Sequence, residues 1–174
     1  RTELEAAVWN NIGLAAWSAG ELEKAERALV RAIGLRRERG DLWGEAVALN
    51  NLALVEDDRG NVDRAIRGVR RALSIRERLG DTSVVIGLGN LADFLYSGGE
   101  LEESLEIGEH ALRRCRDAKL PSLEGSIVYA VGLTSHALGR TGRARQLATE
   151  SRALARRFEN RRIEAYALGL LARC

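Results

Sequence analysis

The chain has 174 residues, of which 30% are charged and 45% apolar, and its formal net charge is +2. This composition predicts a folded, soluble domain and does not indicate a disordered chain. The longest apolar runs are far shorter than the roughly 20 residues of a membrane-spanning helix, and the net charge is too small to indicate nucleic-acid binding by itself. Cys115 and Cys174 lie far apart and form no motif, so we expect a reducing, cytoplasmic environment.

The residue types favour helices separated by glycine turns. Alanine, leucine, arginine and glutamate are frequent, and Pro121 is the only proline. Apolar residues recur at helical spacing, which predicts helices in chain order at residues 2–18, 22–39, 42–58, 62–79, 82–97, 101–118, 122–138, 142–158 and 162–173. Thr2 (with Glu5), Asp41 and Asp81 are predicted N-caps for three of these helices.

A period of about 40 residues runs through the sequence. Its marker is a small residue in the first helix of each unit, which recurs at intervals of 40, 39, 40 and 40 residues: Gly13, Ala53, Ala92, Gly132 and Ala172. A glycine follows seven residues after each of the first four markers, and further small residues follow twelve and nineteen residues after them. This pattern predicts stacked helical hairpins, in which each chain reversal is a glycine and small residues let the paired helices approach closely.

The period divides the chain into a single array. We predict four repeats, residues 1–40, 41–80, 81–120 and 121–160, followed by a closing helix or half repeat at residues 161–174. The closing helix would cap the fourth hairpin, because the ends of a solenoid need covering.

The repeat resembles the tetratricopeptide repeat, in which a large residue and Leu-Gly are followed by Ala-x-x-x-Phe. The segments that carry the likeness are Trp9-Asn10-Asn11-Ile12-Gly13 and Ala25-x-x-x-Leu29. The common unit has about 34 residues and a closing proline, whereas the proline column here holds Arg37, Glu77, Arg116 and Arg156. This longer form is similar to the repeats of kinesin light chains, Pins-type proteins and bacterial STAND- and LuxR-type regulators. The resemblance implies an all-α, right-handed superhelical solenoid of antiparallel hairpins that binds proteins or peptides and is not an enzyme.

In such a stack the first helices line the concave side, and the face that packing leaves free is offered to a ligand. We predict that this groove is lined by Asn10, Asn11, Trp17, Asn50, Asn51, Leu54, Asp57, Asp58, Asn90, Asp93, Tyr96, Tyr129, Leu133 and His136. An asparagine side chain donates and accepts hydrogen bonds, so a ladder of Asn11, Asn51 and Asn90 would hold a peptide backbone of any sequence. The same asparagines can instead tie neighbouring helices together, and Trp17 or Leu54 can simply pack on the adjacent repeat.

Summed over the four repeats, the first helices carry net negative charge and the second helices carry net positive charge. Acidic residues around Glu56, Asp57, Asp58 and Asp93 predict a groove that accepts a cationic or neutral ligand and disfavours DNA. Arginine pairs recur once per repeat on the second helices, and a solvated outer face explains them better than contact with nucleic acid. The sequence contains no zinc-ligand spacing, glycine-rich phosphate loop or spaced nucleophile and base, so we expect no metal, no cofactor and no catalysis.

The chain starts within a first helix and stops after a fifth one, so we expect it to be part of a longer array. We predict a protein- or peptide-binding module, the sensor or scaffold arm of a larger bacterial signalling or transcription-regulatory protein. The alternative is a structural module that forms a homo-oligomer through its last helix, at Leu168, Leu170 and Leu171, with no ligand in the groove.

Overall fold

The computed structural model describes residues 2–81 and 84–174, and this part of the chain is helical, with no strand. The helices are α1 (Thr2–Ser18), α2 (Leu22–Glu38), α3 (Leu42–Asp58), α4 (Val62–Arg78), α5 (Val85–Ser97), α6 (Leu101–Asp117), α7 (Pro121–Ala137), α8 (Thr141–Arg157) and α9 (Arg161–Arg173). Every predicted boundary agrees within one residue, except the start of α5, which was predicted at residue 82, outside the described part. The predicted all-α fold is therefore confirmed.

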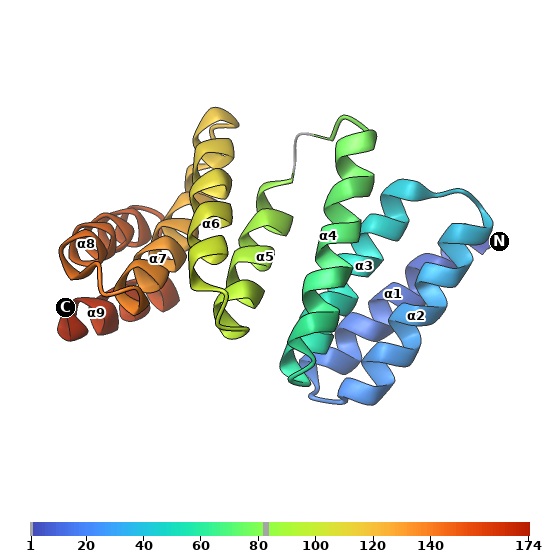
Figure 1. The fold of residues 1–174 in the computed structure, drawn as a ribbon. Coiled ribbons are helices and arrows are strands. Elements are labelled where there is room, and N and C mark those ends of the chain that lie inside the picture. The colour runs from blue at the N-terminus through green and yellow to red at the C-terminus, as the bar shows by residue number, and fades with distance from the viewer. Residues whose placement is uncertain (1, 82–83) are drawn as a thin grey trace. The chain divides into compact units, whose positions relative to one another are not determined.

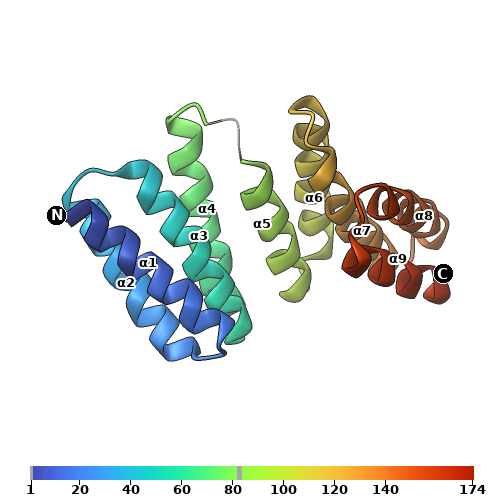
Figure 2. The ribbon, with the colours of Figure 1, turned by 180° about the vertical axis from the view of Figure 1, so that it is seen from behind.

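The chain divides into two compact units, residues 1–87 and 88–174. We call α1, α3, α5, α7 and α9 the A helices, and α2, α4, α6 and α8 the B helices. In the first unit the A helices α1 and α3 form one layer and the B helices α2 and α4 form the other (Figures 1 and 2). In the second unit α7 packs against α6 and α8, and α9 packs against both α7 and α8. Each unit is thus built from stacked antiparallel hairpins.

The hairpins turn at the predicted glycines. Gly20 adopts the left-handed conformation, with φ of 77°, and its N–H donates to the carbonyl of Trp17 at 2.9 Å. This conformation costs a residue with a Cβ atom free energy, which explains why glycine recurs at the turn. At two turns from a B helix to the next A helix, Lys119 and Glu159 take the same conformation, with φ of 52° and 55°.

The small markers bring the two helices of a hairpin into close contact. A Cβ atom built on Gly13 would lie 2.6 Å from Cγ of Leu29 and 3.4 Å from the carbonyl oxygen of Ala25, both on α2. Leu29 and Ala25 are fully buried, so neither can move aside easily. Gly132 plays the same part in the second unit, where its Cβ would lie 3.2 Å from Cβ of Leu147 on α8.

Local chemistry fixes the helix starts. Asp41 caps α3 as predicted, because its carboxylate accepts a hydrogen bond from the N–H of Gly44 at 2.9 Å. Pro121 occupies the first turn of α7, where a missing N–H costs nothing. The side chain of Thr2 and residues 82–83, which follow Asp81, lie outside the described part. The predicted caps at Thr2 and Asp81 therefore stay predictions.

Arginine–glutamate pairs join three of the B helices, α2, α6 and α8, to the A helix that follows. Glu45 is 4% exposed, and its Oε1 accepts from Nε of Arg37 at 2.7 Å and lies 3.1 Å from a guanidinium nitrogen of Arg71. Equivalent pairs join Arg116 to Glu124 at 2.6 Å and Arg156 to Glu164 at 3.1 Å. The arginines in the column of the usual proline therefore link successive hairpins, and they are not merely solvated.

We expect Gly13→Ala to destabilise the protein, because the added methyl group meets the buried Leu29 side chain. Overpacking of this kind costs about 1–3 kcal/mol. The matched control is Gly34→Ala in α2, where a Cβ meets nothing within 4 Å. There, helix propensity should stabilise the fold by about 0.5–1 kcal/mol. Urea unfolding measures both, and equal effects of the two substitutions would contradict the close-approach explanation.

Candidate peptide-binding surface

The structure distributes the predicted groove residues over both units, eight on α1 and α3 and six on α5 and α7. In the first unit, the amide of Asn51 donates to the side-chain oxygen of Asn10 at 3.0 Å. Asn10 is buried, Asn50 and Asn51 are half-buried, and Asn11 is exposed. The Asn10–Asn51 bond ties α1 to α3, which was one of the two roles considered for these asparagines. The exposed amide of Asn11 can still meet a ligand.

Trp17 and Asp58 form a second link between α1 and α3. The indole Nε1 of Trp17 donates to Oδ2 of Asp58 at 2.5 Å. The half-buried Trp17 ring packs on a core cluster that includes Ala16 and Val55, so its apolar surface is used mainly for packing. The Asp58 side chain is exposed, and it gives this end of the α1–α3 face a negative charge.

The sequence predicts Asp57 and Glu56 on an acidic face open to a ligand, but Asp57 is half-buried and Glu56 is buried. Burial raises the pKa of Asp57, and the neighbouring charge of Asp58 raises it further. Glu56 is 5% exposed, accepts from Nδ2 of Asn61 at 2.7 Å and lies 3.6 Å from Arg64. The prediction that Glu56 contributes to an acidic groove is wrong, because its carboxylate is turned toward α4 and neutralised there. Leu54 is half-buried.

Aromatic side chains gather on the A helices of the second unit. The rings of Tyr129 on α7 and Tyr166 on α9 lie 5.6 Å apart between centroids and are tilted by 31°. The pKa of Tyr129 is raised, and burial is the main cause. The charge and hydrogen bond of Arg173 act in the opposite direction and lower this pKa, whereas the charges of Tyr96 and Tyr166 add to the increase. The rings of Tyr129 and Tyr166 are thus in contact, and the charge of Tyr96 acts on Tyr129. We call these three residues the tyrosine cluster.

Sequence analysis did not identify Tyr166 as a member of this surface. Tyr166 precedes the marker Ala172 by six residues, a column that holds none of the predicted groove residues. Tyr166 is 48% exposed, whereas Tyr96 and Tyr129 are half-buried.

The other predicted residues of the second unit surround the cluster less closely. Asp93 is exposed and Asn90 is half-buried, and both already interact within the protein. Leu133 and His136 are half-buried, and Nδ1 of His136 lies 3.7 Å from Sγ of Cys174.

The predicted self-association end requires one correction. Leu170 is fully buried, and its Cδ2 would lie 3.3 Å from a Cβ on Gly132, so it belongs to the core of the second unit. Leu168 is 43% exposed and Leu171 is half-buried. Of the three leucines predicted to form this end, only Leu168 is exposed.

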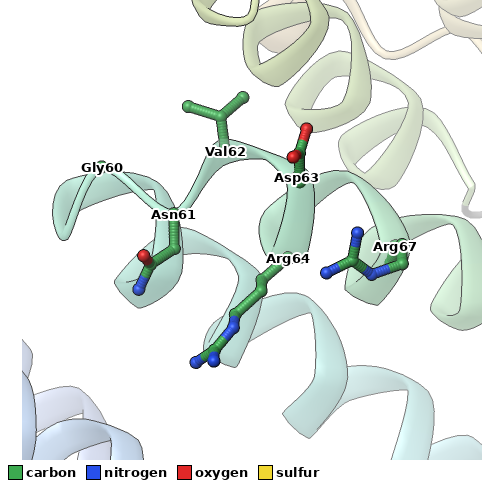
Figure 3. A pocket seen from close by; sticks show the side chains of 6 residues that line it. All are labelled: Gly60, Asn61, Val62, Asp63, Arg64 and Arg67. Atoms are coloured by element: carbon green, nitrogen blue, oxygen red, sulfur yellow. The ribbon is translucent and has the colours of Figure 1, made fainter.

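A cavity of about 350 Å³ at the start of α4 is separate from the predicted groove. Its lining is Gly60, Asn61, Val62, Asp63, Arg64 and Arg67 (Figure 3). It lies on a B helix, and Arg64 is engaged by Glu56, so it adds nothing to the A-helix face. Among the described residues, no group of three or more His, Cys, Asp or Glu side chains could hold a metal ion.

Comparison with known proteins identifies the repeat. Two sequence models described as "Tetratricopeptide repeat" match residues 4–78 and 88–118. The chain belongs to the tetratricopeptide-repeat family. No match was found among curated proteins. Within the described ranges, no helix of this tetratricopeptide-repeat chain is long and apolar enough to cross a bilayer.

Solved structures share the fold at low sequence identity. A STAND-type signal-transduction ATPase from Pyrococcus horikoshii with a tetratricopeptide repeat sensor is 17% identical, with a TM-score of 0.88, and the match covers 98% of this chain and 27% of that one. A Rap protein complexed with Competence and Sporulation Factor is also 17% identical, with a TM-score of 0.85 and coverages of 98% and 48%. A putative kinesin light chain from Podosopora anserina with TPR-like repeats is 14% identical, with a TM-score of 0.74 and coverages of 89% and 76%. This tetratricopeptide-repeat chain therefore spans about a quarter and about half of the first two proteins.

The raised pKa of Asp57 gives a test of the α1–α3 face. Because the folded protein holds this proton more tightly than the unfolded chain, stability should fall as pH rises from the ordinary value of 3.8 through the folded pKa. Asp58→Asn removes only the second cause, so the pKa of Asp57 should fall but stay above 3.8. A carbon-13 NMR titration of the carboxyl measures it, and an unchanged pKa would show that the two carboxylates do not interact.

Proposed function

We propose that this chain is a non-catalytic peptide-binding arm, the sensor or scaffold part of a larger bacterial signalling or transcription-regulatory protein in the cytoplasm. The observation that carries the proposal is the tyrosine cluster. Tyr96, Tyr129 and Tyr166 come from three different A helices; the rings of Tyr129 and Tyr166 are in contact, Tyr96 interacts with Tyr129, and Tyr166 is exposed. Tyrosine gives a large contact area, a hydrogen-bonding hydroxyl and a small entropy loss, which suits it to recognition of a peptide.

The A-helix face of the first unit offers polar contacts of its own. Asn11 offers an exposed amide that can pair with a peptide backbone, and Asp58 offers a negative charge at the end of α3. Asp57 adds a second carboxylate next to it; burial is the main cause of its raised pKa, and the charge of Asp58 raises the pKa further. A cationic peptide side chain would relieve this repulsion, so we propose a cationic or neutral ligand and not an acidic one.

The related structures support a sensor role. The Rap structure is described as a complex with Competence and Sporulation Factor, and the STAND protein as carrying a tetratricopeptide repeat sensor. We propose that a peptide or protein bound on the A helices of this chain likewise controls another part of the same protein.

Selection from a random peptide library on the immobilised chain, followed by calorimetric titration of the selected peptides, tests the proposal. We expect Tyr166→Ala to weaken binding at least tenfold, because the exposed ring is lost from the cluster. Such a loss corresponds to about 1.4 kcal/mol, which is usual for an interface aromatic. Asn11→Ala should weaken binding of those peptides that reach the first unit.

The matched control is Phe158→Ala, which removes an aromatic side chain that is 37% exposed and stacks on Arg157 at the end of α8. Its affinity should equal that of the unchanged protein, and circular dichroism should show the same helix content in all variants. If Tyr166→Ala and Asn11→Ala bind as tightly as this control, or if the selection yields no peptide, the proposed function is wrong.

A further inference from the structure

One side of α3 carries an apolar stripe that begins at an exposed tryptophan. Trp43, in the first turn of α3, is 57% exposed. Val47 and Leu54 follow four and eleven residues later on the same side of the helix, and both are half-buried. The buried residues of α3 occupy its other side: Gly44, Glu45, Ala46, Ala48, Leu49, Ala53, Val55 and Glu56.

The exposure of this side is a property of a helix inside the first unit. Helix α3 packs against α1, α2 and α4, so it has neighbouring helices both before and after it in the chain (Figure 2). These neighbours cover the buried side and leave the Trp43 side open. A large exposed aromatic side chain is the residue type that most often anchors a partner.

Two carboxylates stand at the other end of the stripe. Asp57 is half-buried and Asp58 is exposed, and both lie on the same side of α3 as Trp43. The indole N–H of Trp17 donates to Oδ2 of Asp58 at 2.5 Å, which fixes the position of this carboxylate. A carboxylate has further lone pairs, so Asp58 can accept from a ligand as well. We call Trp43, Val47, Leu54, Asp57 and Asp58 the α3 stripe.

The two arginines that follow these carboxylates in the sequence bind other partners. Arg59 forms an ion pair with Glu26 on α2. Arg64 lies 3.6 Å from Glu56, on the buried side of α3. Because both arginines are engaged elsewhere, the charge at the end of the α3 stripe is left for a ligand, and a cationic group complements it.

The length of the α3 stripe limits what can contact both of its ends. Asp57 and Asp58 follow Trp43 by 14 and 15 residues, which at the helical rise corresponds to about 21–23 Å along the axis. An extended chain covers at most about 3.3–3.6 Å per residue, so roughly six or seven residues of peptide span this distance. A shorter extended segment reaches only one end.

We propose that the α3 stripe selects an extended peptide segment that carries a large apolar side chain and, about six residues away, a lysine or arginine. The apolar side chain packs on Trp43, the segment runs along Val47 and Leu54, and the cation pairs with Asp58. This inference rests on the proposed function and adds the kind of peptide that the first unit recognises.

Designed peptides test the spacing on the whole chain. Each fluorescent peptide carries a phenylalanine and two lysines, separated by either five or two serine and threonine residues, and each is made in both orders. In at least one order, we expect the longer spacer to bind at least tenfold more tightly in fluorescence anisotropy, because the shorter one cannot reach both ends. Its affinity should fall as salt rises, and glutamates in place of the lysines should weaken binding at least tenfold.

Trp43→Ala and Asp58→Asn should each weaken binding of the long-spacer peptide at least tenfold. Asp58→Asn removes the charge and keeps an oxygen that can accept from Trp17, so the link between α1 and α3 is preserved. The matched controls are Phe158→Ala, an exposed aromatic side chain of the second unit, and Asp63→Asn, an exposed carboxylate on α4. Both controls should bind with unchanged affinity.

The proposal is overturned by equal affinities for the two spacers in both orders, by no binding of any designed peptide, or by an affinity that Trp43→Ala leaves unchanged. The proposed function is judged separately: library-selected peptides that depend on Tyr166 and not on Trp43 would keep that function and refute the α3 stripe. Light scattering adds one more outcome. A dimer that Trp43→Ala dissociates would assign the stripe to a second copy and overturn the proposal as well.

Discussion

The close approach of the two helices in each hairpin is the constraint on which the rest of the structure depends. Gly13 has no room for a methyl group against Leu29, and Gly132 is similarly close to α8. Because the marker columns turn each A helix toward its own B helix, they also determine which side of the A helix stays outside the hairpin. The same contact therefore fixes both the core and the surface on which a ligand can bind.

Two kinds of interaction then use what the hairpins leave exposed. Ion pairs such as Arg37–Glu45 join one hairpin to the next, in the column where the shorter repeat has proline. On the A helices, some residues of the predicted groove instead hold α1 against α3, through the Asn10–Asn51 and Trp17–Asp58 hydrogen bonds. What remains exposed is a smaller set, chiefly Asn11 and Asp58 in the first unit and Tyr166 in the second. This remainder is polar, acidic and aromatic, and the proposed peptide recognition rests on it.

The sequence predicts the helices almost to the residue, because the markers and turn glycines recur in register and each has a steric reason. It predicts less well whether the side chain of a single residue is exposed or buried. Asn10 was predicted in a ligand groove and Leu170 at an exposed end of the chain, but both are buried. The position of a residue in the repeat predicts which side of the helix its side chain is on, but not how far a neighbouring helix covers it. Glu56 was counted with Asp57, yet its longer side chain reaches Asn61 and Arg64. Tyr166 was overlooked because only its contact with Tyr129 distinguishes it from a solvated residue.

The central claim is that recognition takes place on the A helices. Its most direct test is NMR mapping of a library-selected peptide on protein labelled in tyrosine rings and asparagine side-chain amides. The account predicts that the peptide shifts the ring signals of Tyr96, Tyr129 and Tyr166, while the amide of Asn61 at the start of α4 stays unchanged. Shifts that are confined to the B helices, with the tyrosine rings unaffected, would contradict it.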